Sequence, residues 1–400
     1  MGKDLRTRPL IDVLTVYGPE SLAGLRSEWN DLADRCPCHY LSQNWRWAAD
    51  AWMVVAAPSG HELRILALRE GDCLVALWPL VICRRAGFRI VRQLGSESSE
   101  YTSPLCEIGP RQHEYVARLW HAAHSLGDVL VLCHVRSDNP LADLLGRHPF
   151  RSFPEKPISA PWIARADYGQ WADYLATLST SRLSGLRRKR RRLAEVGHLD
   201  VKLHPGPVSE ALIDSLLAHK KAWMSRHGLS CEWLERSAYR AFLLALVSGA
   251  DSRDGLQLFS LSVNGTPIAF QLNAVEVRRV EFLIGAFDER WARYSPGQIL
   301  MMECIRWSFE RGLDYDFRIG DEPYKSTWAR RDTPTFDCKV GLSHRGTAAL
   351  WLMRFYRKVQ RRLRALAGRL RLPSLRATRG TAAGAVAPGR RHGDLTGMEI

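Results

Sequence analysis

Along the first 150 residues, apolar side chains recur with two periods, one typical of strands and one typical of helices. Two alternating runs, LRILAL and LVALWPLVIC, flank a turn at Glu70-Gly71-Asp72 and predict a long β-hairpin. The run DVLVLCHV (128–135) is apolar throughout, which is typical of a strand buried on both faces. The other elements predicted here are strands over 10–17 and 88–94 and helices over 20–34, 44–55 and 112–126.

The pattern of the second half repeats this plan. A second hairpin joins LQLFSLSV to PIAFQLNAVEV through Asn264-Gly265, a dipeptide that favours a tight turn between two strands. The segments ILALREGDCLVALWPL and LFSLSVNGTPIAFQL align with one gap, glycine over glycine. This alignment favours an internal duplication, although any two hairpins share such a pattern and a chance likeness stays open. The remaining predicted elements are strands over 158–164, 198–204 and VEFLIGAF, and helices over 168–178, 182–195, 209–226 and 235–247.

Together these elements predict an α/β protein of two halves, each a mixed sheet flanked by helices. We place the first half at 8–150 and the second at 155–345, since 400 residues are enough for two or three domains. From residue 346 the pattern predicts an amphipathic basic helix. The tail after Pro373 is rich in Gly, Ala, Arg and Pro, and we expect it to be disordered.

The segment 291–328 carries the most chemical information. It begins with the turn Ser295-Pro296-Gly297, continues as a helix that is apolar almost all round, and ends in a polar loop. Pro296 suits the first turn of a helix, Ser295 has a hydroxyl that can cap it, and Gly297 lets a ligand approach the backbone. Exposed amides at such a helix start can hold phosphate oxygens, although an ordinary helix start without a ligand stays open.

Composition places the chain among ordinary globular proteins, with 46% hydrophobic and 25% charged residues. No apolar run approaches the roughly 20 residues that cross a bilayer. The N-terminal sequence lacks the apolar stretch of a signal peptide. The nine cysteines are scattered, with Cys36 and Cys38 as the one close pair, so we expect no metal site and a reducing, cytoplasmic location.

The net charge of +15 is concentrated in two segments. Residues 182–192 contain seven basic residues and no acidic one, and residues 345–400 contain thirteen basic and two acidic residues. The rest of the chain is therefore slightly acidic. For 182–192 three interpretations stay open: a solvated helix face, contact with an anionic acceptor or acyl carrier, and binding of nucleic acid.

The basic segment 346–371 is also strongly amphipathic. Arginine and lysine side chains flank an apolar stripe made of Leu352, Phe355, Val359, Leu363, Leu366 and Leu370. A helix of this kind can lie on an anionic membrane surface, which would place the protein peripherally at the inner face of the membrane. It can equally pack its stripe on its own domain and leave the charges in water.

Several motifs at fixed order mark the second half, namely Arg293-Tyr294-Ser295-Pro296-Gly297, Arg311-Gly312-Leu313, Asp316-Phe317, Gly320-Asp321, Tyr324-Lys325 and Trp328. With the order of strands and helices, they resemble the acyltransferase core of the GNAT superfamily. Within it the chain looks most like the CelD/BcsL-like acetyltransferases, a family linked to cellulose or exopolysaccharide biosynthesis. The resemblance is good over 167–343 and fainter in the first half. The chain is also similar to Fem-type aminoacyl transferases, which have two GNAT-like halves.

This resemblance implies a donor site. Arg293 and the turn formed by Ser295, Pro296, Gly297 and Gln298 would receive the pyrophosphate of acetyl-CoA or another acyl-CoA. The turn contains proline and is more compact than the usual GNAT loop, so fewer backbone amides are free. The thioester would lie where the strands VEFLIGAF and LDYDFRI diverge.

Four residues are candidates for the chemistry of acyl transfer. Asp316 lies in the second of these strands, where a carboxylate among apolar residues suits a general base, and a structural ion pair with Arg318 is the alternative. Glu322 is a second candidate base. Tyr324 could protonate the departing thiolate, and Lys325 could stabilise an anion or oxyanion. A loop that only positions the substrate is equally compatible with this sequence.

The leading hypothesis is a cytoplasmic GNAT-type N- or O-acyltransferase. It would use acyl-CoA, and no metal, to acylate a hydroxyl or amine of a small molecule or saccharide, such as a cellulose-type precursor. One alternative is a Fem-like enzyme that uses aminoacyl-tRNA, the one case in which we expect a nucleic-acid partner. Another is a non-enzymatic protein that binds nucleic acid or a membrane surface. Under both enzyme hypotheses we expect the first half to be a scaffold for the second.

Overall fold

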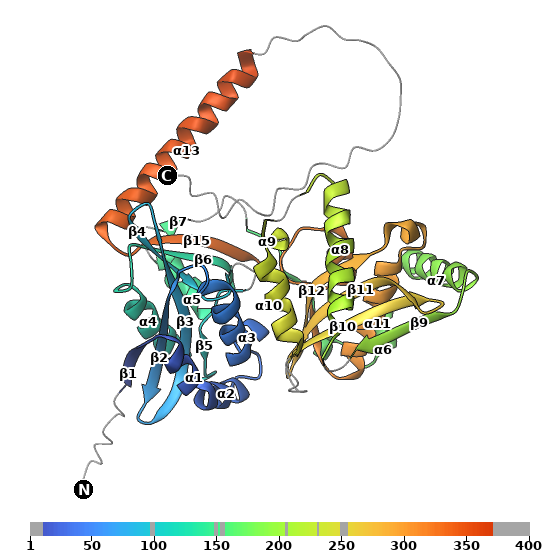
Figure 1. Cartoon of the computed structure of the whole chain (residues 1–400), viewed down its shortest axis with the longest axis horizontal. Coiled ribbons are helices and arrows are strands. Elements are labelled where there is room, and N and C mark those ends of the chain that lie inside the picture. The colour runs from blue at the N-terminus through green and yellow to red at the C-terminus, as the bar shows by residue number, and fades with distance from the viewer. Residues whose placement is uncertain are drawn as a thin grey trace.

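The computed structural model of the chain describes residues 11–96, 101–147, 151–152, 157–204, 207–229, 232–248 and 255–370. The described residues form two β-sheets, each flanked by helices, which occupy the left and right of Figure 1. The α/β architecture of two halves that the sequence predicts is therefore confirmed. The disorder predicted after Pro373 falls outside the described residues.

The first sheet is built mainly from the N-terminal half of the chain. Its long hairpin, β2 with β3, is antiparallel, whereas β4 and β6 pair in parallel. The strand order is β1 (Ile11–Tyr17), β2 (Glu62–Glu70), β3 (Cys73–Arg85), β4 (Phe88–Gln93), β6 (Val129–Arg136), β15 (Thr335–Gly341) and β7 (Arg151–Ser152), with β5 (Leu105–Cys106) paired to β3. The helices of this half are α1 (Pro19–Gly24), α2 (Arg26–Arg35), α3 (Trp45–Asp50), which continues as the π-helix η2 (Ala51–Ala56), α4 (Gln112–Ala123) and α5 (Pro140–Arg147).

One strand of the first sheet comes from the far end of the sequence. β15 lies between β6 and β7 and pairs antiparallel with both. Residues 335–341, which the sequence places in the second half, thus complete the sheet of the first. The chain crosses from one half to the other twice, and the boundaries 8–150 and 155–345 stay a prediction.

The second sheet is antiparallel except at one pair of strands, β12 and β13. Its order is β14 (Arg331–Asp332), β8 (Pro161–Ile163), β13 (Asp314–Asp316), β12 (Arg279–Phe287), β11 (Thr266–Val275), β10 (Gly255–Val263) and β9 (Leu199–His204). The helices are α6 (Trp171–Ala176), α7 (Thr180–Ala194), α8 (Glu210–Arg226), α9 (Glu232–Glu235), α10 (Ser237–Ser248), η5 (Glu289–Tyr294), α11 (Pro296–Glu310) and α12 (Pro323–Trp328).

The two long hairpins share a structural detail that their sequence alignment does not require. In each, the register shifts directly after an aligned leucine, Leu68 in the first and Leu261 in the second. In each, the aligned turn glycine, Gly71 or Gly265, has a positive φ that favours glycine. A bulge at the same place in both hairpins supports the internal duplication.

A hydrophobic core joins the two halves. Helices α3 and η2 of the first half pack against α10 of the second, and the rings of Trp47 and Phe242 meet edge to face at 4.9 Å. A separate core fills the opposite face of the second sheet, where α11 is buried along most of its length. The halves therefore hold a defined relation, and residues of one can contribute to a site in the other.

Helix α13 (His344–Leu370) packs on the first sheet near its start, through Leu350 and Met353. Its later turns project away from the body of the protein (Figure 1). Leu352 and Phe355 of the apolar stripe are 70% and 68% exposed, so the described side chains of the stripe do not support the alternative that it packs on its own domain. Among the described helices, none is both long and apolar enough to span a membrane.

Candidate active site

The candidate site lies where β12 and β13 stop pairing. These parallel strands share three residue pairs, from Arg279 with Asp314 to Glu281 with Asp316. β12 then continues to Phe287, whereas the chain after Asp316 follows β8, with the Phe317 amide donating to the Pro161 carbonyl. This is the divergence of strands at which the resemblance places the thioester.

Glu281, which the sequence reasoning did not select, occupies this divergence. Its side chain is fully buried in β12, and its Oε1 accepts a hydrogen bond from the backbone amide of Leu41, 3.2 Å away. Among the described residues, its Oε2 has no hydrogen-bond partner. Burial raises the pKa of Glu281, and the nearby guanidinium groups of Arg318 and Arg279 oppose that rise. The signal was present in the sequence as the one carboxylate within VEFLIGAF.

Asp316 lies beside Glu281, but its two carboxylate oxygens are both occupied. Oδ1 accepts from the hydroxyl of Tyr101 at 3.0 Å and from the amide of Arg318 at 2.6 Å. Oδ2 faces the guanidinium of Arg136 at 3.4 Å. The side-chain ion pair is thus with Arg136 of the first half, a contact that could not be anticipated from the neighbouring Arg318. Asp316 is better placed to hold the two halves together than to accept a proton.

Arg136 and Tyr101 bring the first half directly into the candidate site. Arg136 ends β6, and its guanidinium also bonds Asp138 and, at 2.9 Å, the hydroxyl of Thr333. Burial raises the pKa of Tyr101 well above its usual range, so its hydroxyl stays protonated and can donate to Asp316. The first half therefore does more than scaffold the second.

Lys325 is buried in α12 at the end of the polar loop. Its ammonium donates to the backbone carbonyl of Ile319 and lies 3.0 Å from Glu322, whose side chain is half exposed. Burial lowers the pKa of Lys325, and the charge of Glu322 counteracts this. A Cβ on Gly320, where φ is 135°, would lie 2.0 Å from the Glu322 carboxylate. Only glycine fits at this position, so the backbone of the loop passes close to the paired side chains of Glu322 and Lys325.

Tyr324, next to Lys325, is partly buried against the core beneath α11. Burial raises the pKa of Tyr324, and the charge of Glu322 raises it further. The phenol is therefore protonated at neutral pH, as a proton donor must be.

The turn before α11 differs in detail from its expected form. Ser295 adopts a left-handed conformation, with φ 52° and ψ 53°, and its side chain does not cap the helix. The expectation of a serine cap is therefore wrong, because the left-handed backbone turns the hydroxyl away. Backbone carbonyls already accept from the amides of Ser295, Gln298 and Ile299. Pro296 has no amide proton, so this turn offers few free amides, as its sequence implies.

Cationic side chains of α7 surround this turn instead. The ammonium of Lys189 donates to the Ser295 hydroxyl at 2.7 Å. The side-chain oxygen of Gln298 accepts from Arg182 at 2.7 Å and from the indole of Trp328 at 3.0 Å. Gln298 thus links three motifs that lie far apart in the sequence.

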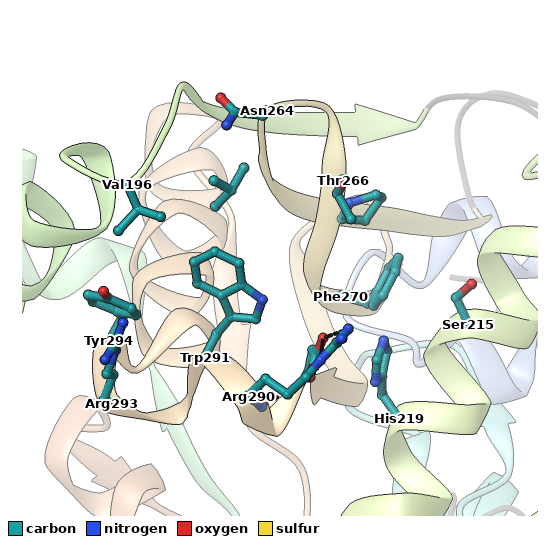
Figure 2. A pocket seen from close by; sticks show the side chains of 13 residues that line it. Val196, Ser215, His219, Asn264, Thr266, Phe270, Arg290, Trp291, Arg293 and Tyr294 are labelled. Atoms are coloured by element: carbon teal, nitrogen blue, oxygen red, sulfur yellow. Dashed lines mark hydrogen bonds and ion pairs between the residues drawn. The ribbon is translucent and has the colours of Figure 1, made fainter.

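An open cavity of about 700 Å³ lies between η5, α8 and the β10–β11 turn. Figure 2 shows Trp291 and Tyr294 on one side of it and His219 of α8 on the other. Arg293, expected at the donor site, is exposed at its rim with the guanidinium 4.7 Å from the ring of Tyr294. Within the described part of the chain, no cluster of three His, Cys, Asp or Glu side chains could hold a metal.

Comparison with known proteins agrees with this geometry. Residues 180–326 match the sequence model of the family described as an acetyltransferase (GNAT) domain. The fold of the chain is GNAT-like. The matched segment contains β12, β13, the turn before α11 and Lys325, so the GNAT part of the resemblance is confirmed. It supports transferase activity for this half of the protein.

Solved structures show the same fold. The chain is similar to a crystal structure of FemX, with 12% identity, a TM-score of 0.55 and coverage of 78% of this chain and 95% of that one. It is also similar to the C-terminal domain of a putative lysylphosphatidylglycerol synthetase from Agrobacterium fabrum, with 13% identity, a TM-score of 0.50 and coverage of 83% and 95%. A search of curated protein sequences finds no match.

Proposed function

We propose that the protein transfers an acetyl or other acyl group from acyl-CoA to a hydroxyl or amine of a sugar or polysaccharide precursor, as the CelD/BcsL-like resemblance implies. The observation that carries the proposal is the buried carboxylate oxygen of Glu281, which has no hydrogen-bond partner among the described residues and lies at the point where β12 and β13 diverge. It lies inside the segment that matches a GNAT domain. An acyl transfer needs a base at this position, and a carboxylate with a raised pKa and an unused oxygen can serve as one.

In this proposal the acceptor attacks the thioester carbonyl carbon and passes its proton to Oε2 of Glu281. The carbon–sulfur bond then breaks, and the departing thiolate takes a proton from the phenol of Tyr324. Lys325, held by Glu322, offers its positive charge to the oxyanion that forms before the bond breaks. Asp316 positions the strand end through Tyr101 and Arg136 rather than moving a proton itself.

The donor would lie along β12, with its phosphates at the start of α11. Calorimetry of acetyl-CoA binding to the wild type and to the Gly297→Asp variant tests this placement. We expect the new carboxylate to abolish binding by repelling the phosphates. Gly297→Ala is the matched control, because its Cβ meets only the ring of Phe287, at 3.2 Å, and adds no charge. Equal binding by Gly297→Asp and the wild type would contradict the placement.

A Fem-like transfer from aminoacyl-tRNA is the second candidate. The specific observation in its favour is that the turn before α11 has few free amides, while Arg182 and Lys189 of the arginine-rich helix α7 bond to it. For such an enzyme, the affinity for charged tRNA would rise steeply as the salt concentration falls, and acetyl-CoA would not bind.

We further propose that α13 attaches the protein to an anionic membrane surface. Its described residues contain no acidic side chain, and the exposed apolar residues include Trp351, Leu352 and Phe355. An apolar face flanked by arginines matches a layer of anionic headgroups above hydrocarbon. This attachment would bring the active site to acceptors made at the membrane.

A further inference from the structure

The basic helix α7 lies against the start of α11, where the donor phosphates are expected. Two neighbouring faces of α7 have different partners. Leu186 and Leu193 are buried on the face that also carries Arg182 and Lys189, whose head groups bond Gln298 and Ser295. This spacing of three or four residues places all four side chains on one side of the helix. The contact fixes α7 beside the turn and gives the turn two positive charges.

The next face of α7 is exposed and mostly unpaired. Arg190 forms an ion pair with Glu303 of α11. No acidic partner among the described residues is seen for the other exposed arginines of the helix, Arg187, Arg188, Arg191 and Arg192. Like charges packed on one helix repel each other and destabilise it. An anion bound beside these arginines would offset this repulsion.

A second cavity adds an independent observation. It has a volume of about 520 Å³ and is lined by Arg187, Arg190, Arg191 and His198. The first cavity, with Arg290 and Arg293, borders the same end of α7 through Val196 (Figure 2). Both cavities are therefore bordered by the segment 194–199, and the first also reaches Arg293 and Tyr294, directly before the turn that precedes α11. Together they form a basic track around the C-terminal end of α7.

We propose that this track binds the phosphate groups of the donor's carrier through side chains, in place of the backbone amides that the turn lacks. The inference rests on the proposed acyl transfer and names how its donor is held. Arginine suits the role because its planar guanidinium bonds two phosphate oxygens at once. The phosphates can come from coenzyme A or from tRNA. The chemistry of recognition is the same for both.

The test is the double variant Arg187→Ala/Arg191→Ala in the full-length protein. Binding of acetyl-CoA is measured by calorimetry, and binding of aminoacyl-tRNA is measured at several salt concentrations. We expect the affinity for whichever carrier binds the wild type to fall about tenfold or more, because two charged hydrogen-bond donors to phosphate are lost. For tRNA, the slope of log affinity against log salt should shrink by about one to two units.

Two controls separate charge recognition from general damage. Arg187→Lys/Arg191→Lys keeps the charge but loses the bond to two oxygens at once, so its affinity should lie between those of the wild type and the Ala variant. Arg147→Ala/Lys221→Ala removes two exposed cations from α5 and α8 that line neither cavity, and it should bind as the wild type does.

The outcomes distinguish this inference from the proposed function. Weaker binding of acetyl-CoA by the Ala variant supports the track with coenzyme A as carrier. Weaker binding of aminoacyl-tRNA, with no acetyl-CoA binding, supports the track and overturns the acyl-CoA donor. Unchanged binding of the carrier, in a protein that still transfers the acyl group, overturns the track and leaves the function standing. A wild type that binds neither carrier overturns both.

Discussion

Each of the two sheets contains a short parallel pair of strands, but the side chains beside the pair differ between the sheets. In the first, β4 and β6 pair in parallel over three residues, from Ile90 with Val129 to Arg92 with Val131. In the second, β12 and β13 pair in parallel over three residues, from Arg279 with Asp314 to Glu281 with Asp316. A helix connects the strands in each case, α4 in the first and α11 in the second. The same parallel pairing of three residues, with a helix in the connection, therefore exists twice.

The side chains beside these two pairings differ in chemistry. Arg92 has the place in the first sheet that Glu281 has in the second. The next residue, Gln93, accepts from the indole of Trp78 at 3.2 Å and the amide of Ser103 at 3.0 Å, and its own amide donates to the carbonyl of Tyr101 at 3.2 Å. Glu281, in contrast, has a buried carboxylate oxygen without a hydrogen-bond partner among the described residues. The first pairing therefore ends in a cation and a neutral amide, and the second ends in a group that can take a proton.

The first half still contributes a side chain to the site. Arg136, from the end of β6, reaches Asp316 at the end of β13. The comparison shows that two copies of one arrangement can supply different groups to a single site. The second half supplies the base, and the first half supplies the charge that orders the strand end.

The largest expected effect comes from removing the carboxylate that distinguishes the second pairing from the first. Glu281→Gln replaces the open carboxylate with a neutral amide, which cannot accept a proton. We expect kcat for acyl transfer to fall about 100-fold or more, the usual contribution of a general base. The matched control is Glu276→Gln, another buried glutamate of this half, which pairs with His39. A similar loss in both variants would show that any buried carboxylate matters and would remove the special role of Glu281.

The second prediction breaks the link between the halves. Arg136→Ala leaves the buried carboxylate of Asp316 without its cation. We expect a loss of about 3–5 kcal/mol in the free energy of unfolding, measured with urea. In an Asp316→Asn background the same change should cost much less, because no charge is then left unpaired. A loss below about 1 kcal/mol in the native background would mean that the ion pair does not hold the strand end.

The third prediction concerns Lys325, which is buried in α12 beside Glu322. Lys325→Ala or Glu322→Gln should lower the turnover number at least tenfold, since an oxyanion contact or its partner is lost. Because burial lowers the pKa of Lys325, activity should decline as pH rises through a value below that of an ordinary lysine. A folded Lys325→Ala protein with a near wild-type rate would show that the loop only positions substrate.

The smallest effect on catalysis is expected from α13, which lies outside the comparison. Removal of residues 346–400 should abolish binding to vesicles that contain anionic lipid and should leave acyl transfer in solution within about twofold, because no candidate site residue lies there. High salt should weaken the binding of the full chain. Equal sedimentation of the two proteins with the vesicles would rule out α13 as the anchor.

Local patterns in the sequence were sufficient for much of the fold. The Asn264-Gly265 turn, the start of α11 at Pro296 and its end before Gly312 are where the residues predict them, because each depends on nearby backbone preferences. Glu281 could also have been found, as a lone carboxylate in a buried strand. Sequence reasoning selected Asp316 on the same ground, as a carboxylate among the apolar residues of the neighbouring strand.

Other features depend on contacts that no local pattern encodes. The return of β15 to the first sheet and the ion pair of Arg136 with Asp316 join segments about 180–200 residues apart, and such pairings depend on the whole fold. The left-handed backbone at Ser295 follows from the packing of α7 and α11 around it, so the serine could not be assigned correctly from its type alone.

The most direct test of the central claim is the pH dependence of acyl transfer by the wild type and by Glu281→Gln. Burial raises the pKa of Glu281, so the wild-type kcat/KM should fall as pH drops through a value above the ordinary range of glutamate, where the base becomes protonated. Glu281→Gln should be slow at every pH and should lack this acidic limb. A Glu281→Gln protein that keeps both the rate and the acidic limb of the wild type would contradict the account.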